Sequence, residues 1–268
     1  MTTDPLSPSQ RAHLNLIESS RRFFEFDRGS VVEVEPGWLL GAGTPEHPVI
    51  SNAVFRIDDD ADAGELIAHA KDFFGARGRG FSLWVRGEEA GDQDLVAAAT
   101  EAGMQQVYAM PEMILSHRVE TPEPREGAEL RRLTVEDAGG KDFWEIASSS
   151  YVDIGWPPEN LAVYEDQAGL AGEDVVSFIA YLDGKPVSIA MTIVSHGVAG
   201  IYWVGSLKEA RGKGLARATT AAATNAGFDL GADIASLQAS PMGKPIYQEM
   251  GYETIFDYRL LMSPPPSA

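Results

Sequence analysis

The sequence predicts an α+β protein, layered as in α/β folds, with two domains. Three observations support this prediction. The chain has 268 residues, enough for one large core or two small ones. Strand-like and helix-like segments alternate in both halves. Between the halves, Ser116 to Gly127 has two prolines, mixed charges and no apolar periodicity, which is typical of an extended linker. We therefore expect domains over 1–115 and 128–262, a linker over 116–127 and a disordered tail over 263–268.

The first half is expected to contain three helices. Ser9 to Phe26 and Ala63 to Phe74 repeat apolar residues at helical spacing. Asp92 to Ala102 is rich in alanine and stops at Gly103, a common glycine position after a helix. Strands are expected where β-branched and aromatic residues gather, at Val31–Leu40, Ala53–Ile57, Phe81–Val85 and Met113–Leu115.

The second half is expected to begin with a strand at Leu130–Leu133 and a helix through Phe143, Trp144 and Ile146. An irregular segment, Ser148–Gly172, follows. Asp183-Gly184 is a strong hairpin signal. The remaining strands of this half are expected on either side of that turn and further along the chain, at Val175–Leu182, Pro186–Ser195, Ile201–Leu207 and Ala235–Gln238.

Composition excludes several kinds of function. The net charge is −19, so a basic surface for binding nucleic acid is not expected. Acidity favours a cationic substrate such as an amine, although solubility alone explains it equally well. The chain has no cysteine, which excludes disulfides, thiolate–metal sites and a cysteine nucleophile. We expect no metal and no membrane span, and, because the N-terminus has no signal-peptide pattern, a cytoplasmic protein.

A glycine-rich segment, Val204 to Ala216, joins an expected strand to an expected helix. Gly212 and Gly214 remove the side chains that would keep a phosphate away from the backbone N–H groups of a helix N-terminus. Arg211 and Lys213 can add charge-assisted hydrogen bonds to phosphate oxygens. The segment therefore predicts a pyrophosphate-binding loop, with an ordinary glycine-rich turn as the alternative.

Two competing phosphate motifs fail at this segment. A P-loop needs Ser or Thr after the lysine, but Lys213 is followed by Gly214. A dinucleotide fingerprint, G-x-G-x-x-G, would need glycine where Arg217 stands. Neither nucleotide-binding motif is therefore present.

Arg211-x-x-Gly214-x-Ala216 resembles the R/Q-x-x-G-x-G/A signature of GNAT (GCN5-related) N-acetyltransferases. A second block, from Ser240 to Tyr252, is similar to the family's short helix that ends in Tyr-x-x-x-Gly-(Phe/Tyr), here Tyr247-x-x-x-Gly251-Tyr252. The resemblance covers roughly 128–262, with its core in 201–252. It implies a mixed, mostly antiparallel central sheet flanked by helices.

The resemblance also implies an activity, in which acetyl-CoA donates an acetyl group to a primary amine by direct attack in a ternary complex. The acceptor would be a small molecule or a peptide or protein amine, and the protein a monomer or homodimer. A non-catalytic acyl-CoA-binding or regulatory protein is the alternative. By this resemblance the cofactor-binding residues are Val204, Gly205 and Ser206 for the pantetheine arm and Arg211, Gly212, Lys213, Gly214, Leu215, Ala216 and Arg217 for the pyrophosphate.

Tyr247 aligns with the family's tyrosine that protonates the departing thiolate, with aromatic packing as its alternative role. The general base stays open among His196, Asp153, Glu145 and a water chain. Aromatic residues of the second half could line an acceptor pocket or simply pack in the core: Trp156, Tyr151 and Trp203.

The first half repeats the order of the second in weakened form, with Ala53–Ile57 and Ala63–Phe74 matching the strand and helix around the motif. Where the loop should be stands Asp58-Asp59-Asp60-Ala61-Asp62. Four carboxylates would repel a phosphate, so we expect no CoA site there. The chain thus resembles tandem GNAT proteins with a degenerate N-terminal copy.

Overall fold

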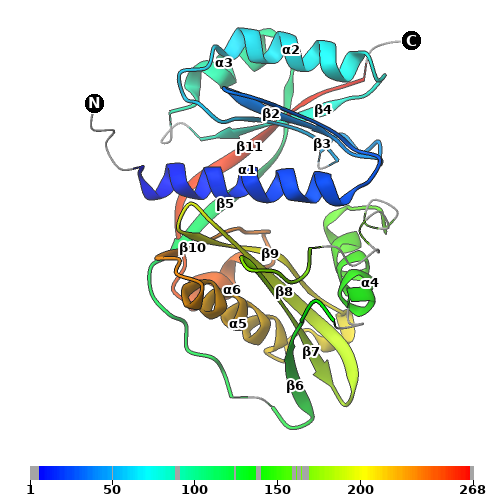
Figure 1. Ribbon diagram of the computed structural model, residues 1–268, viewed down its shortest axis with the longest axis vertical. Helices are drawn as coiled ribbons and strands as arrows, with labels where there is room; N and C mark the ends of the chain where they lie inside the picture. The colour runs from blue at the N-terminus through cyan, green and yellow to red at the C-terminus, as the bar shows by residue number, and fades with distance from the viewer. Residues whose placement is uncertain are drawn as a thin grey trace. The chain divides into compact units, whose positions relative to one another are not determined.

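The computed structural model describes residues 6–49, 51–87, 91–123, 125–136, 140–158, 161, 164 and 169–265. Contacts divide the chain into two compact units. Unit 1 is drawn from Met1–Ser19 and Met113–Glu253, and unit 2 from Ser20–Glu112 and Thr254–Ala268. Each unit combines a sheet with helices, so the predicted α+β class is confirmed (Figure 1).

Unit 2 has the strand order β1-β2-β3-β4-β11. The pairs β1–β2, β2–β3 and β4–β11 are antiparallel, whereas β3 and β4 are parallel and are connected through α2. The elements are β1 (Val31–Glu35), β2 (Trp38–Ala42), β3 (Asn52–Arg56), α2 (Ala63–Gly75), β4 (Phe81–Arg86), α3 (Gln93–Glu101) and β11 (Glu253–Ser263). The single strand predicted over Val31–Leu40 is thus a hairpin of two strands.

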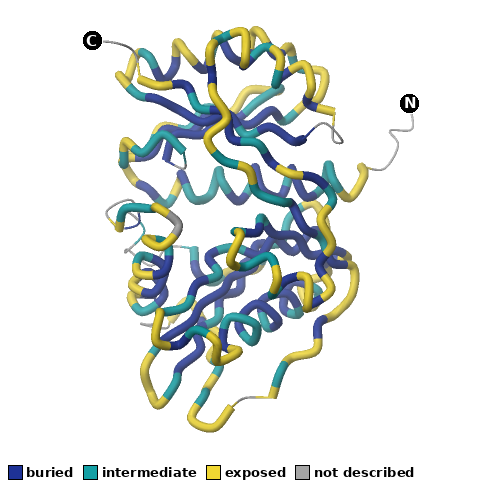
Figure 2. The backbone as a smooth tube through the Cα atoms, turned by 180° about the vertical axis from the view of Figure 1, so that it is seen from behind, coloured by how far each residue is buried: buried dark blue, intermediate teal, exposed yellow. Residues whose placement is uncertain are grey.

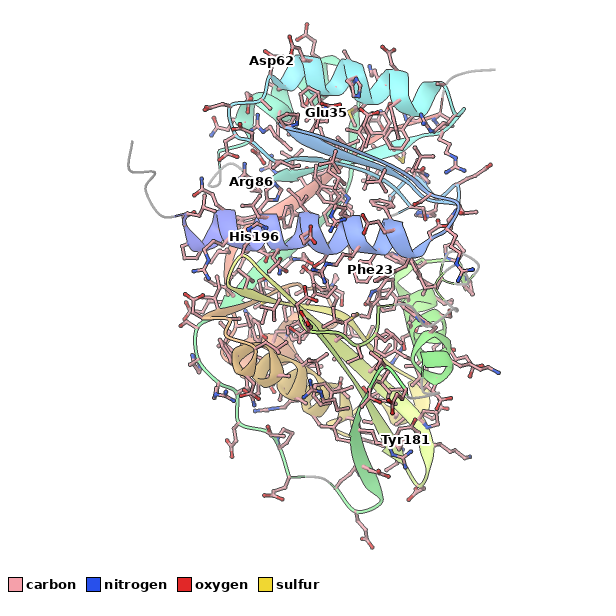
Figure 3. All side chains as sticks on the ribbon, viewed as in Figure 1. Phe23, Glu35, Asp62, Arg86, Tyr181 and His196 are labelled. Atoms are coloured by element: carbon pink, nitrogen blue, oxygen red, sulfur yellow. The ribbon has the colours of Figure 1, made fainter. Side chains whose placement is uncertain are left out.

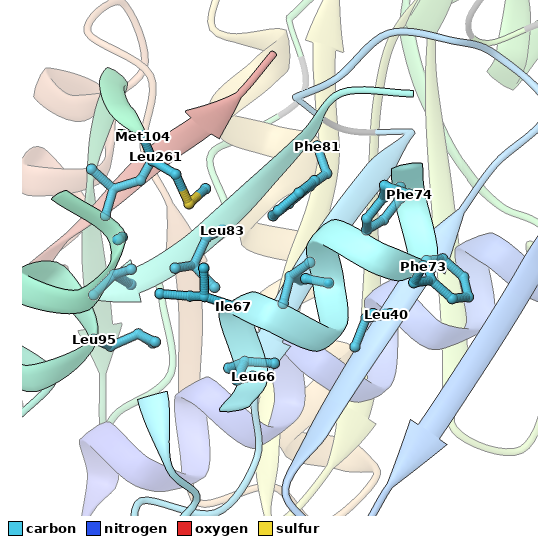
Figure 4. Close-up of a cluster of buried hydrophobic side chains, with 14 of the residues drawn as sticks. Leu40, Leu66, Ile67, Phe73, Phe74, Phe81, Leu83, Leu95, Met104 and Leu261 are labelled. Atoms are coloured by element: carbon cyan, nitrogen blue, oxygen red, sulfur yellow. The ribbon is translucent and has the colours of Figure 1, made fainter. Parts of the chain in front are cut away.

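The core of unit 2 lies between α2 and its sheet (Figure 4). The residues that predicted a helical face, among them Leu66, Ile67 and Phe74, are buried against Leu40, Leu83 and other strand residues. The rings of Phe74 and Phe81 stack with centroids 4.8 Å apart. The apolar residues that recur along one face of α2 and the apolar residues that alternate along the strands are therefore buried together in one layer.

Unit 1 has the strand order β10-β9-β8-β7-β6. Strands β6 to β9 are antiparallel neighbours, and β10 is parallel to β9 with α5 as the connection. The elements are β6 (Ala128–Arg132), α4 (Gly140–Tyr151), η2 (Val152–Ile154), β7 (Val175–Leu182), β8 (Lys185–Ser195), β9 (Val198–Ser206), η5 (Lys208–Ala210), α5 (Leu215–Asp229), β10 (Ile234–Gln238) and α6 (Lys244–Glu249).

Helix α5 lies very close to its sheet because its inner face is made of small residues. A Cβ added at Gly227 would lie 2.2 Å from the Cβ of Ala199 on β9. Ala221 and Ala223 are fully buried in the same cluster. This close approach fixes the direction of the helix axis, so its N-terminus is held where the glycine-rich segment ends.

The two compact units differ from the predicted domains at both ends of the chain. The N-terminal segment belongs to unit 1 and the C-terminal segment to unit 2. β11 follows the second block but pairs with β4 in unit 2. α1 (Pro8–Phe26) begins in unit 1, where the buried Asn15 donates from Nδ2 to the carbonyls of Ile193 and Val198, each at 3.1 Å. A single side-chain amide that donates hydrogen bonds to the carbonyls of a distant hairpin produces no periodic pattern in the sequence. This contact could therefore not be predicted from the sequence.

The strand β5 (Gln105–Leu115) starts in unit 2 and ends in unit 1, where Met113 and Leu115 join the apolar cluster of α5. The segment that follows, predicted as the linker, has no helix or strand in its described residues and is largely exposed, while the strands are mostly buried (Figure 2). No helix among the described residues is long and apolar enough to cross a membrane.

Candidate functional site

The glycine-rich segment forms the predicted strand–loop–helix connection. The strand β9 ends at Ser206, and the Leu207 N–H then donates to the Val187 carbonyl at 2.9 Å. After η5 the chain passes through Gly212 and Gly214, whose φ values are +70° and +79°. Side chains rarely adopt this left-handed conformation, and at these two positions it requires glycine.

The start of α5 presents backbone donors that have no protein acceptor. In the described part of the chain, no hydrogen bond is formed by the N–H groups of residues 212 to 217. Gly214 is the N-cap and has no side chain to cap the helix. Free N–H groups together with the positive end of the helix dipole make a binding site for an anion.

Arg211 is already engaged by other groups of the protein. Its N–H donates to the Lys208 carbonyl at 3.3 Å, so this group is not part of the free donor array. Its guanidinium pairs with Asp153 at 2.5 Å, and Lys208 pairs with the other oxygen of Asp153 at 2.9 Å. The sequence prediction missed Asp153 as a partner because the two residues are far apart in the chain.

The other cations of the segment differ in their surroundings. Lys213 is exposed, with no ion pair to any described residue. The Arg217 guanidinium lies 3.8 Å from a carboxylate oxygen of Glu249. Lys213 is therefore the basic side chain most available to a bound anion.

The strand β9 has an open edge at its C-terminal end. It pairs with β8 from Val198 to Ser206, but with β10 only from Val198 to Gly200. Among the described residues, the stretch Val204–Ser206 therefore has a strand neighbour on one side only. The open backbone groups can pair with an extended ligand, as in the addition of a strand to a sheet edge.

A bulge in β9 orients the side chain of Trp203 towards α4. Opposite β8, the register shifts between Ile189 and Met191, and Trp203 has a φ of +53°. An extra residue in one strand turns the following side chains. The Trp203 ring contacts Trp144 and Tyr151 of α4, with centroid distances of 5.3 and 5.2 Å.

The residues Gly205 and Ser206 are held by hydroxyl groups that sequence reasoning missed. Ser188 Oγ donates to the Gly205 carbonyl at 3.0 Å and lies 2.7 Å from Ser206 Oγ. A Cβ added at Gly205 would lie 2.9 Å from Ser150 Oγ, so this position needs glycine for space. Isolated serines carry no motif, and only the pairing of β8 with β9 brings these groups together.

Tyr247 lies on α6 and is 8% exposed. Burial raises the pKa of its hydroxyl, so the group stays protonated at neutral pH. Its ring packs at an edge-on angle against Tyr252, 6.1 Å away. The Tyr252 hydroxyl lies 2.7 Å from Thr224 Oγ1, whereas no described residue is hydrogen-bonded to the hydroxyl of Tyr247. The two neighbouring tyrosines therefore differ in whether their hydroxyl is already used.

The three side chains considered as general bases are poorly suited to that role. Hydrogen bonds from Lys208 and Arg211 lower the pKa of Asp153, so it is a weaker base than a free aspartate. Glu145 is exposed and lies 3.5 Å from Lys141. His196 lies in the turn before β9 (Figure 3), at the far end of a nine-residue strand, which at about 3.3 Å per residue spans roughly 26 Å.

No group of three His, Cys, Asp or Glu among the described residues has an arrangement that could hold a metal ion. The site is therefore characterised by backbone donors, two glycines with positive φ, a buried tyrosine and an aromatic cluster. Free backbone N–H groups at a helix N-terminus are typical of a site for an anionic ligand.

Comparison with known proteins agrees with this geometry. Residues 140–252 match the family model "Acetyltransferase (GNAT) family". No curated protein matches the sequence. Among solved structures, a GCN5-related N-acetyltransferase from Kribbella flavida is similar with a TM-score of 0.73 and 19% identity, covering 98% of this chain and 97% of that one.

Two further structures are similar over nearly their whole length. One is a GCN5-related N-acetyltransferase from Sphaerobacter thermophilus, with a TM-score of 0.64, 13% identity and coverage of 98% and 96%. The other is a tandem GNAT protein from the clavulanic acid biosynthesis pathway, with a TM-score of 0.63, 12% identity and coverage of 97% and 95%. Residues 140–252 of this chain therefore match the GNAT acetyltransferase family, and the chain as a whole has a fold similar to that of tandem GNAT proteins.

Proposed function

We propose that this protein is an acetyl-CoA-dependent N-acetyltransferase that acts on a primary amine. The observation that carries the proposal is the array of free N–H groups from Gly212 to Arg217 at the start of α5. A pyrophosphate has oxygens that can accept several such bonds at once. Lys213 adds a positive charge beside them.

The residues of the site fit acetyl-CoA, which supplies an activated acyl group as a thioester. The open edge of β9 at Val204–Ser206 offers backbone groups for the amides of the pantetheine arm. An N–H of this stretch can also donate to the thioester carbonyl as negative charge develops on its oxygen. Ser188 keeps the stretch in place through the Gly205 carbonyl.

Tyr247 is proposed as the proton donor. When the amine nitrogen bonds to the acyl carbon and the carbon–sulfur bond breaks, the nitrogen loses a proton to solvent water and the sulfur leaves as a thiolate that takes a proton from Tyr247. Solvent water then returns a proton to the tyrosine. The hydroxyl of Tyr247 is protonated at neutral pH because burial raises its pKa. Among the described residues it has no other hydrogen-bond partner, so it is available to donate.

The test is release of free thiol from acetyl-CoA in the presence of a panel of primary amines. Tyr247→Phe should lower kcat by about 100-fold or more, since general acid–base catalysis typically contributes a factor of about 100 to 10,000. The Kd for CoA should be nearly unchanged. Tyr252→Phe is the matched control, because its hydroxyl is bonded to Thr224; it should lower stability but keep kcat.

Two results would contradict the proposal. CoA binding by calorimetry without thiol release for any amine would instead support a non-catalytic acyl-CoA-binding protein. Equal kcat for Tyr247→Phe and the unmodified protein would show that Tyr247 is not the proton donor. The proposed acetyl-CoA site would not be affected by that result.

A further inference from the structure

Ser188 of β8 lies where the open edge of β9 meets the start of α5. Its side chain is fully buried, so it is not available to contact a ligand directly. Ser188 Oγ donates to the Gly205 carbonyl at 3.0 Å and lies 2.7 Å from Ser206 Oγ. Thr219 Oγ1 of α5 is 3.5 Å away. A single hydroxyl of β8 is therefore in contact with both of the elements that form the proposed acetyl-CoA site.

The protons of these hydroxyl groups have defined acceptors. Each hydroxyl has one proton to donate. Ser188 uses its proton for the Gly205 carbonyl, so in the contact between the two serines Ser206 is the donor. Thr219 Oγ1 donates to the Ala216 carbonyl at 3.0 Å, within its own helix. The hydrogen bond from Ser188 to Gly205 is therefore not shared with another acceptor.

The carbonyl that Ser188 binds belongs to the peptide unit between Gly205 and Ser206. In an antiparallel pair, the backbone groups of successive residues point alternately towards the partner strand and away from it. The Leu207 N–H donates to the Val187 carbonyl, so the backbone of Leu207 points towards β8. By this alternation the Gly205 backbone also points towards β8, whereas the Ser206 backbone points to the open edge.

The Ser206 N–H is a free donor at this edge. The Ser206 carbonyl already accepts a hydrogen bond from Arg211 Nε at 3.4 Å. No described residue accepts one from the Ser206 N–H. Ser206 is half-buried, so a ligand that lies along the edge can reach it. A ligand with a carbonyl oxygen can therefore take this hydrogen bond.

The hydrogen bond from Ser188 controls how this N–H is presented. Because a peptide unit is planar and trans, its C=O and N–H groups point in opposite directions. Holding the Gly205 carbonyl against Ser188 therefore fixes the direction of the Ser206 N–H. A hydrogen bond accepted by the carbonyl also polarises the peptide unit, which makes its N–H a stronger donor.

The place of Ser206 in β9 indicates which part of acetyl-CoA it meets. In the proposed function the pyrophosphate binds from Gly212 onward, and the pantetheine arm extends from there along β9 towards Val204. At about 3.3 Å per residue, Ser206 lies roughly 7 Å nearer to the loop along the strand than Val204 does. Ser206 is therefore placed beside the amides of the arm, and the thioester lies further along the strand.

From these contacts, and on the basis of the function proposed above, we propose that Ser188 is a positioning residue for acetyl-CoA. It orients and polarises the Gly205–Ser206 peptide, whose N–H donates to an amide carbonyl of the pantetheine arm. Ser188 itself does not touch the ligand. Its loss therefore weakens binding of the arm and leaves the pyrophosphate site and the chemical step intact.

The experiment measures the Kd of acetyl-CoA and of ADP by calorimetry, with the full chain and its variants. ADP carries a pyrophosphate but no pantetheine arm. In Ser188→Ala the Kd for acetyl-CoA should rise about three- to tenfold, as expected for one hydrogen bond, while the Kd for ADP stays the same. In the thiol-release assay, KM for acetyl-CoA should rise by a similar factor, with kcat within about twofold of the unmodified value.

Ser177→Ala is the matched control. Ser177 is also a fully buried serine of this sheet, but its hydroxyl has no hydrogen-bond partner in the described part of the chain. This variant should leave both Kd values unchanged. Ser206→Ala keeps the bond between Ser188 and Gly205, so it should raise the Kd for acetyl-CoA less than Ser188→Ala does. Circular dichroism verifies that the variants fold.

A second measurement uses the unmodified protein. In NMR spectra, the amide proton of Ser206 should move downfield when acetyl-CoA binds, because it enters a hydrogen bond, and should stay in place when ADP binds. An unchanged Ser206 signal with acetyl-CoA, or an equal shift with ADP, would contradict the proposed contact.

The failure of this inference differs from the failure of the proposed function. An unchanged Kd for acetyl-CoA in folded Ser188→Ala, an equal rise in the Kd for ADP, or a loss of kcat alone would overturn the role of Ser188 and leave the acetyltransferase activity standing. Absence of acetyl-CoA binding by the unmodified protein would overturn the proposed function itself, and the role of Ser188 with it.

Discussion

Two segments of the molecule share one topology and differ in chemistry. In unit 1, β9 leads through a loop into α5 and then to the parallel strand β10; in unit 2, β3 leads through a loop into α2 and then to the parallel strand β4. The first loop contains Gly212 and Gly214, and α5 begins without a side-chain cap. The second loop is made mostly of aspartates.

In the unit 2 loop, aspartate carboxylates accept hydrogen bonds from backbone N–H groups of the same segment. Asp62, which is labelled in Figure 3, caps α2 by accepting a hydrogen bond from the Glu65 N–H at 2.8 Å. Asp58 accepts one from the Asp60 N–H at 3.0 Å. Asp59 pairs with Arg86. Backbone N–H groups that are free in the first loop thus have counterparts bonded to internal carboxylates in the second, and the charge of these carboxylates opposes a phosphate.

The comparison shows that a strand–loop–helix connection is not an anion site by topology alone. What matters is whether the N–H groups at the helix start are left free. In unit 2, the charge network behind the loop is buried: Arg56, Arg86 and Asp92 are each no more than 2% exposed. We expect this network to stabilise unit 2 and the unit 1 loop to bind CoA.

The largest effect is expected from Asp92→Asn. Asp92 accepts hydrogen bonds from Arg86 at 2.7 and 2.9 Å and from Arg56 at 2.6 Å. Removing one charge of a buried pair leaves the others uncompensated and costs about 3–5 kcal/mol. Urea unfolding of the full chain should show this loss. Asp59→Asn, whose side chain is 46% exposed, is the control and should cost less than about 1 kcal/mol.

The stability contributed by Asp92 should also depend on pH. Burial alone would raise the pKa of Asp92, but hydrogen bonds and charge from Arg86 and Arg56 outweigh it and lower the pKa. Because the folded pKa lies below the unfolded value of about 3.9, the contribution is fully present above that pH and is lost as the pH falls through the folded pKa. Equal loss of stability by Asp92→Asn at pH 7 and at strongly acidic pH would contradict this account.

The second effect is expected from Gly214→Val. A side chain in the left-handed conformation costs about 1–2 kcal/mol, and branching at Cβ adds to it, so the loop must rearrange. The Kd for CoA, measured by calorimetry, should rise by at least about tenfold. Gly64→Ala, in the first turn of α2, is the matched control and should leave the Kd unchanged. A normal Kd in folded Gly214→Val would show that the donor array is not the binding site.

The smallest effect is expected from Asp153→Asn. This change frees Lys208 and Arg211 and removes a negative charge beside the loop. The Kd for CoA should fall several-fold, with a steeper dependence on salt because more cations face the phosphates. Asp142→Asn is the control, because the Asp142 carboxylate accepts a hydrogen bond from the Tyr181 hydroxyl. The Kd for CoA should not change in this variant. Weaker binding by Asp153→Asn would mean that the ion pairs hold the loop in its binding shape.

The sequence alone determined the features that depend on neighbouring residues. The apolar period of α2, the Asp183-Gly184 hairpin and the two glycines before α5 act through local backbone preferences, and the structure confirms the elements they predict. The resemblance to the GNAT superfamily could also be recognised from the sequence, because the signature of that superfamily is a set of residues within one loop and one helix.

Only the tertiary structure decided which distant residues meet. The pairing of β11 with β4, the contact of Asn15 with a distant hairpin and the ion pair of Arg211 with Asp153 join segments that are far apart in the chain. The bulge that turns Trp203 towards α4 depends on the register between two strands. Such pairings are selected by the burial and hydrogen bonding of the whole fold, which no local pattern of residues records.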